Sequence, residues 1–178
     1  MPTGSTSGKR KGLERVSDSR GVIAALAIDQ RTALRSLIAK AKGVIPEAIP
    51  GEMLVEFKEA ASRILTQHSE YSLPTARARA TNAGLFLAYE QSGYDKAIPG
   101  RLPHLLEHWS AKRLVDAGAD CVKILLYYSP SSSTEINDSK HAWVECIGAE
   151  CCALDVPLFL ELVSTAKVWK TKAGNLPK

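Results

Sequence analysis

Three ionisable side chains lie within or at the end of stretches that are otherwise apolar, namely Asp29, Lys123 and Glu161. An amine and two carboxylates held together can move protons to and from a bound molecule, as general acid–base catalysis requires. Burying such charges without partners is costly, so they must pair with one another or with a ligand. The pattern indicates either a structural ion pair between neighbouring strands or a catalytic site, and the residues alone leave both open.

The stretches that carry these residues have the length and composition of buried strands. Continuous apolar runs predict strands over residues 21–29, 83–90, 121–128 and 157–163. Helical periodicity predicts helices around residues 34–41, 52–66, 102–116 and 136–154. The repeated βα order predicts an α/β fold with a parallel sheet, either open or closed into a barrel. Neither a G-x-G-x-x-G motif nor a P-loop is present, which disfavours the nucleotide-binding forms of such sheets.

The alternation of side chains along the strands predicts where the charges point. In strand 121–128, Lys123 shares a face with Leu125 and Tyr127, while the opposite face is aliphatic at its centre. In strand 157–163, Glu161 is likewise opposite a row of leucines. Since the aliphatic faces should meet helices, we expect Lys123 and Glu161 to project from the other face. Barrel enzymes carry out their chemistry at the carboxyl ends of such strands.

Composition and charge narrow the class of protein. The chain has 178 residues, of which 45% are hydrophobic and 24% charged, as in one globular domain. No apolar run reaches the roughly 20 residues that span a bilayer, and no signal-peptide segment is visible, so we expect a cytoplasmic protein without a membrane partner. The net charge of +4 comes from the two ends of the chain. We therefore expect no nucleic-acid partner.

The ends and the cysteines give three further expectations. Residues 1–13 are small, polar and basic and predict a disordered leader, and residues 164–178 form a basic tail. The four cysteines are Cys121, Cys146, Cys151 and Cys152. In the absence of a signal peptide we expect reduced, buried thiols. Their spacing does not match a paired metal-binding motif, so no metal is expected.

Several longer motifs, in a consistent order, resemble those of one known family. They are GVIAALAIDQR (21–31), EYSLPTARAR (70–79), NAGLFLAYEQSGYD (82–95), WSAKRLVDAGADCVKILLYY (109–128) and VPLFLELV (156–163). Together they resemble the class I, Schiff-base type of tagatose 1,6-diphosphate aldolases. The resemblance covers most of residues 14–163, which we interpret as a partial aldolase barrel domain.

The resemblance implies a fold and a reaction. The fold is a (β/α)8 TIM barrel, of which this chain would hold about the first five βα units. The reaction is the reversible cleavage of a phosphorylated ketose, D-tagatose 1,6-bisphosphate, to dihydroxyacetone phosphate and glyceraldehyde 3-phosphate. Neither a metal nor a cofactor is implied, because a lysine amine forms an imine with the substrate ketone and acts as the electron sink.

The resemblance also assigns roles to individual residues. Glu161 matches the family's FLE glutamate and is expected to transfer protons. Lys123 matches the lysine of the fourth strand and is expected to orient the site and tune its electrostatics. Asp29 matches the acidic residue after the first strand and is expected to hold either substrate hydroxyls or the lysine. The remaining expected substrate contacts are Gln30, Arg31 and Tyr127. Glu90 ends an apolar strand and is a weaker candidate, either for a ligand contact or for a salt bridge at the rim.

Two departures from the family bear on activity. The imine-forming lysine of the family lies on a sixth strand, and residues 164–178 do not match that part of the family. The apolar segment that precedes the EYSLP motif in the family is missing near residues 64–74. We therefore expect this chain to be marginally stable and to lack aldol cleavage by itself.

Two alternative functions stay open. One is a sister class I aldolase acting on another ketose phosphate, such as sulfofructose phosphate. The other is a non-catalytic protein that binds sugar phosphate or an aldolase partner. Association into a homo-oligomer is compatible with each of them.

Overall fold

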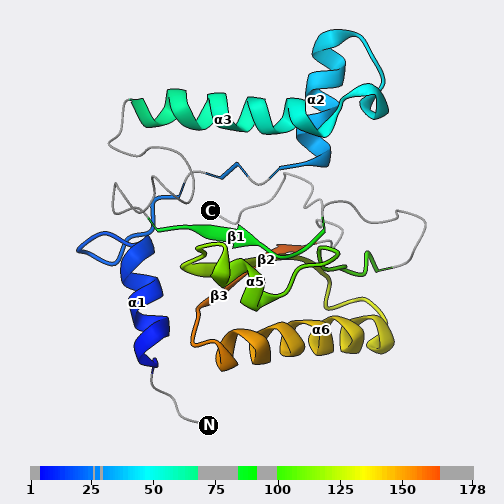
Figure 1. The fold of residues 1–178 in the computed structure, drawn as a ribbon. Helices are drawn as coiled ribbons and strands as arrows, with labels where there is room; N and C mark the ends of the chain where they lie inside the picture. The colour runs from blue at the N-terminus through cyan, green and yellow to red at the C-terminus, as the bar shows by residue number, and fades with distance from the viewer. Residues whose placement is uncertain (1–4, 26, 29, 68–83, 92–99, 165–178) are drawn as a thin grey trace, which may run out of the picture.

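The computed structural model describes residues 5–25, 27–28, 30–67, 84–91 and 100–164. Its elements follow the order α1 (Ser7–Val16), α2 (Thr32–Lys42), the 3-10 helix η1 (Pro46–Ala48), α3 (Gly51–Gln67), β1 (Phe86–Ala88), α5 (Ala111–Asp116), β2 (Cys121–Tyr128), α6 (Thr134–Ala153) and β3 (Leu158–Ser164). Figure 1 shows α5 and α6 on one side of the sheet and the α2–α3 pair on the other. The predicted α/β class is therefore confirmed.

The three strands form one parallel sheet in the order β1-β2-β3. Ala88 lies opposite Lys123, and Lys123 lies opposite Phe159. Because the strands are parallel, their carboxyl ends meet at one edge of the sheet. The prediction that 121–128 and 157–163 are neighbouring parallel strands is confirmed to within one residue at each end.

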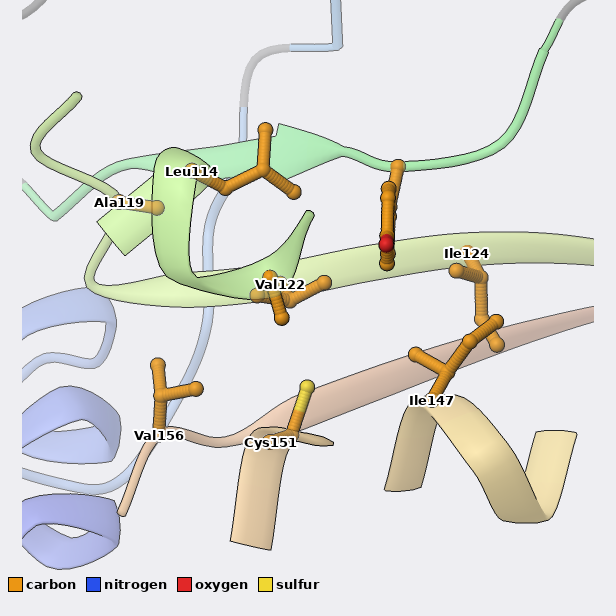
Figure 2. Close-up of a cluster of buried hydrophobic side chains, with 9 residues drawn as sticks. Leu114, Ala119, Val122, Ile124, Ile147, Cys151 and Val156 are labelled. Atoms are coloured by element: carbon orange, nitrogen blue, oxygen red, sulfur yellow. The ribbon is translucent and has the colours of Figure 1, made fainter. Parts of the chain in front are cut away.

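The core lies between the sheet and α5 and α6. Val122 and Ile124 of β2 are fully buried there, as is Ile147 of α6. Leu114 of α5 and Cys151 of α6 complete the contact, as Figure 2 shows. Val122 and Ile124 are the β2 residues whose side chains the alternation predicts to face the helices. Their burial leaves Lys123 on the opposite face of the sheet.

Two predicted elements are wrong in the described residues. Residues 21–25, 27, 28 and 30 do not form a strand, and Val22 is 49% exposed. A strand requires a hydrogen-bonded neighbour, and in the described sheet β1 is paired only with β2. The predicted helix over 102–116 is confined to Ala111–Asp116. Upstream of it, Leu105 instead pairs with Glu90 in an antiparallel bridge.

The helix α1 corrects the prediction of a disordered leader. It crosses the amino-terminal ends of the strands, because Gly12 lies against Asp120 and Pro157, directly before β2 and β3. The Asp155 carboxylate accepts hydrogen bonds from the Thr6 hydroxyl and, at 2.7 Å, from the Gly8 amide. These bonds, with the Thr6 bond first, lower the pKa of Asp155. The helix forms because a distant carboxylate caps its amino terminus, which local apolar periodicity does not reveal.

Substitution of Gly12 tests this packing. A Cβ at residue 12 would lie 2.6 Å from the Asp120 carbonyl oxygen, so Gly12→Ala should lower the free energy of unfolding by about 1 kcal/mol or more. Gly148 of α6 has open space around its Cα and is the matched control, because Gly148→Ala should raise stability by about 0.5–1 kcal/mol. Urea unfolding followed by circular dichroism measures both. A Gly12→Ala protein as stable as wild type would contradict the docking of α1.

The α2–η1 segment packs locally. Leu34 and Ala39 of α2 are buried with Ile49, and Gly43 ends the helix in the left-handed conformation at φ 68°. Apolar side chains on α3 stay exposed, among them Val55 and Phe57. No helix in the described part of the chain combines the length and apolar character that crossing a membrane requires.

The cysteines divide into two classes. Cys121 and Cys151 are buried as expected, whereas the expectation of burial is wrong for Cys146 and Cys152, which are exposed on α6. Burial raises the pKa of the Cys121 thiol to about 12 and that of Cys151 to about 11. The two buried thiols therefore stay protonated and unreactive at neutral pH.

Candidate active site

An ion pair joins the two central charges that the sequence singled out. Lys123 Nζ lies 2.8 Å from Glu161 Oε2. The pair is diagonal, because Glu161 lies opposite Leu125, two residues beyond Lys123 on β2. The Lys123 side chain is 21% exposed and the Glu161 side chain 51% exposed, so a ligand can reach both groups. The prediction that these residues project from the same face of adjacent strands is confirmed.

The strands hold this pair in place by burying their other face. Val122 and Ile124, on either side of Lys123, are packed beneath α5 and α6. A one-residue slip of β2 would bury the ammonium group in this core, which makes the register of the strand strongly specified. On the site face, the rings of Phe86 and Phe159 pack edge to face, with 4.7 Å between their centroids. They form an apolar surface next to Lys123, towards the amino ends of the strands.

A third ionisable group, Glu90, lies at the carboxyl end of β1. It is two residues beyond Ala88, which is opposite Lys123, and so it has the parity of the site face. Burial raises the pKa of the Glu90 carboxyl, and the positive charge of Lys123 partly offsets this effect. The sequence carries a signal for Glu90, because this residue is a lone acid at the end of an apolar stretch, as Asp29 is.

The other predicted site residues are placed differently. The Arg31 guanidinium donates a 3.2 Å hydrogen bond to the carbonyl oxygen of Glu90 and so lies at the same edge. Gln30 is exposed. Asp29 and the EYSLP motif lie outside the described residues. Of the three charges predicted to meet, the structure therefore shows the contact between Lys123 and Glu161, and the position of Asp29 stays a prediction.

Tyr127 extends the site face towards the carboxyl end of β2. The guanidinium of Arg101 lies over its ring, 5.1 Å from the ring centroid, in a cation–π contact. Arg101 has a φ of 48°, which is uncommon for a residue with a side chain. No local pattern in the sequence singles out Arg101, because its contact with Tyr127 joins residues that are distant in the chain.

The arrangement can bind a polar ligand and transfer protons. A carboxylate 2.8 Å from an ammonium can accept a proton from a bound hydroxyl and return it, while the ammonium stabilises negative charge on oxygen. Among the residues that the structure describes, no three His, Cys, Asp or Glu side chains come together in a group that could hold a metal ion.

Comparison with known proteins agrees with these features. The model of the DeoC/LacD family of aldolases matches residues 23–173. A tagatose 1,6-diphosphate aldolase 2 from Enterococcus faecalis is 48% identical over 89% of this chain and 49% of its own length. Tagatose 1,6-diphosphate aldolases from Listeria monocytogenes and Streptococcus agalactiae are 45% and 47% identical, over 96% and 90% of this chain.

The matches cover a larger share of this chain than of its relatives. The family model and the relatives cover most of this chain, whereas the chain spans about half the length of the curated relatives it matches. The matched region contains the sheet, the Lys123–Glu161 pair and Glu90. The chain therefore belongs to the DeoC/LacD family of aldolases.

Proposed function

We propose that this chain contributes the Lys123–Glu161 part of the active site of a class I aldolase that reversibly cleaves D-tagatose 1,6-bisphosphate. The observation that carries the proposal is the 2.8 Å contact between the Lys123 ammonium and the Glu161 carboxylate on the face of the sheet opposite α5 and α6. Family membership and the names of the relatives support the reaction and the substrate. The products are dihydroxyacetone phosphate and glyceraldehyde 3-phosphate.

The proposed fold of the active enzyme is a (β/α)8 barrel. In it β1, β2 and β3 are the third, fourth and fifth strands, and residues 14–163 form about five βα units. The site face of the sheet then points to the barrel interior, where the carboxyl ends of the strands hold the chemistry of such enzymes.

In the proposed reaction a lysine amine, supplied by a sixth strand, adds to the C2 ketone. Glu161 protonates the departing hydroxyl, so that water leaves and an iminium forms. The Glu161 carboxylate then accepts the proton of the C4 hydroxyl while the C3–C4 bond breaks and its electron pair enters the iminium. Glyceraldehyde 3-phosphate leaves, and protonation of the enamine at C3 followed by hydrolysis releases dihydroxyacetone phosphate.

The remaining residues have binding roles in this proposal. The Lys123 ammonium stabilises negative charge that develops on substrate oxygen and orients Glu161. Asp29 and Gln30 bind substrate hydroxyls, and Arg31 and Tyr127 line the approach to the site. Neither a metal nor a cofactor takes part in these steps.

A hybrid protein tests the proposal. It joins residues 1–163 of this chain to the remaining C-terminal part of the Enterococcus faecalis relative. We expect the hybrid to cleave D-tagatose 1,6-bisphosphate and to be trapped by borohydride as an adduct with dihydroxyacetone phosphate, whereas the 178-residue chain does neither. A folded hybrid that binds sugar phosphate without cleaving it would favour the non-catalytic alternative. Faster cleavage of sulfofructose 1-phosphate would favour the sister enzyme.

A further inference from the structure

One feature of Glu90 is not explained by its position in the fold. Its Oε2 atom is buried and has no hydrogen-bond partner in the described structure. Leaving a buried acceptor unsatisfied costs about 1–3 kcal/mol, so a carboxylate in this state is unfavourable for the free protein. Glu90 as a whole is only partly buried, and its backbone is held from two sides, by the bridge to Leu105 and by the Arg31 guanidinium.

The neighbourhood of this carboxyl group is defined by β2. Ala88 is opposite Lys123, and the Tyr89 amide donates a 2.9 Å hydrogen bond to the Lys123 carbonyl oxygen, so the parallel ladder continues up to Glu90. Adjacent strands lie about 4.8 Å apart. Glu161 therefore lies on β3, on one flank of β2, and Glu90 lies on the other flank, two residues beyond the end of β1. Glu90, Lys123 and Glu161 form a row across the carboxyl end of the sheet.

We infer that Glu90 is a ligand-binding residue of this site, and that its Oε2 accepts a hydrogen bond from a hydroxyl group of the ligand. This inference rests on the proposed function and deepens it. A hydroxyl group both accepts and donates a hydrogen bond, and the row offers a donor, Lys123, beside an acceptor on each side. Two neighbouring hydroxyls can each accept from the ammonium and donate to one carboxylate. The row thus selects a vicinal diol, as found in a polyhydroxylated ketose phosphate.

The burial of Glu90 and the charges that surround it set how this residue makes the stability of the protein depend on pH. Lys123 faces it from β2 and Arg31 from the start of α2, while Glu161 lies one strand further away and His104 lies on the segment that pairs with Glu90. Burial raises the pKa of Glu90 and outweighs the opposing effects of backbone hydrogen bonds at Glu90 and Leu125 and of the Lys123 and Arg31 charges. The ionised form therefore costs stability above this pKa, and that cost disappears as the pH falls through it.

The closing experiment uses the 178-residue chain and two ligands. D-tagatose 1,6-bisphosphate carries the hydroxyls, and hexane-1,6-diol bisphosphate carries the two phosphates without them. We expect Glu90→Gln, which replaces an acceptor oxygen by an amide nitrogen, to weaken binding of the ketose bisphosphate at least tenfold and binding of the diol bisphosphate less than twofold, as measured by calorimetry. Glu107→Gln, which removes an exposed glutamate from residues 101–110, is the matched control and should change neither. Glu90→Asp retains the charge, so it should weaken binding of the ketose bisphosphate less than Glu90→Gln does and more than Glu107→Gln does.

Each alternative outcome has a defined meaning. Equal weakening of both ligands, or no weakening, overturns the inference, as does a wild-type chain that does not prefer the ketose bisphosphate. A purely structural Glu90 would lower the urea midpoint without changing the ratio of the two dissociation constants. Cleavage by the hybrid with an unchanged KM in Glu90→Gln would refute the inference and leave the proposed function standing. If the hybrid does not cleave the substrate but Glu90→Gln still weakens binding of the ketose bisphosphate selectively, the proposed function is refuted and the inference stands.

Discussion

Glu161→Gln in the hybrid protein is expected to lower kcat for cleavage of D-tagatose 1,6-bisphosphate by about 10²–10⁴-fold. Glutamine preserves the shape of the side chain but can neither donate a proton to the departing C2 hydroxyl nor accept the proton of the C4 hydroxyl in the next step. It also removes the negative charge that lies 2.8 Å from Lys123. Steady-state cleavage, with glyceraldehyde 3-phosphate followed in a coupled assay, measures the effect.

The control for this substitution is Glu145→Gln, which removes an exposed glutamate from α6 and should leave kcat unchanged. Circular dichroism of both variants checks that the fold is retained. If Glu161→Gln turns over at the wild-type rate, Glu161 is not the proton-transfer group, and the ion pair with Lys123 is structural.

The second large effect is expected in the core. Ile124→Ala should lower the free energy of unfolding by about 2–5 kcal/mol, because Ile124 is fully buried between β2 and the helices. The sheet in the described part of the chain has three strands, and a loss of this size is a large fraction of the stability of a small domain, so we expect the variant to be largely unfolded at 25 °C. Urea unfolding of wild type and variant, followed by circular dichroism, measures the difference.

Leu162→Ala is the matched control for this prediction. Leu162 is on β3 and is 59% exposed, so its truncation should cost less than about 1 kcal/mol. Leu162 and Ile124 have the same helix-facing parity on neighbouring strands, so similar losses at the two positions would contradict the difference in burial between them. The comparison holds the chemistry of the change nearly constant and varies the burial.

Part of the fold could be predicted because it depends on short-range pattern. The run from Cys121 to Tyr128 is apolar enough to be a buried strand, and its alternation separates Lys123 from Val122 and Ile124. The same alternation places Glu161 on the site face of β3, where it pairs with Lys123. Both predictions follow from the two-residue period of a strand, which holds whatever lies on either side.

Other parts could not be predicted because they depend on contacts between distant residues. Residues 21–25 are apolar enough for a strand, yet they have no hydrogen-bonded neighbour in the described sheet. The helix α1 lacks an apolar stripe, and its amino terminus is capped by Asp155, which is far away in the sequence. The periodicity around Leu105 predicts a helix, but the backbone of that residue pairs with Glu90 instead.

The sequence by itself determined the parallel α/β class, the family, and the face from which Lys123 and Glu161 project. The tertiary structure decided that these two side chains meet on a diagonal, that Glu90 lies within electrostatic range of Lys123, and that α1 covers the opposite end of the strands. The physical reason is range. Side-chain alternation and apolar burial act over a few residues and are written locally, whereas strand register, caps and charge partners arise only when distant segments pack together.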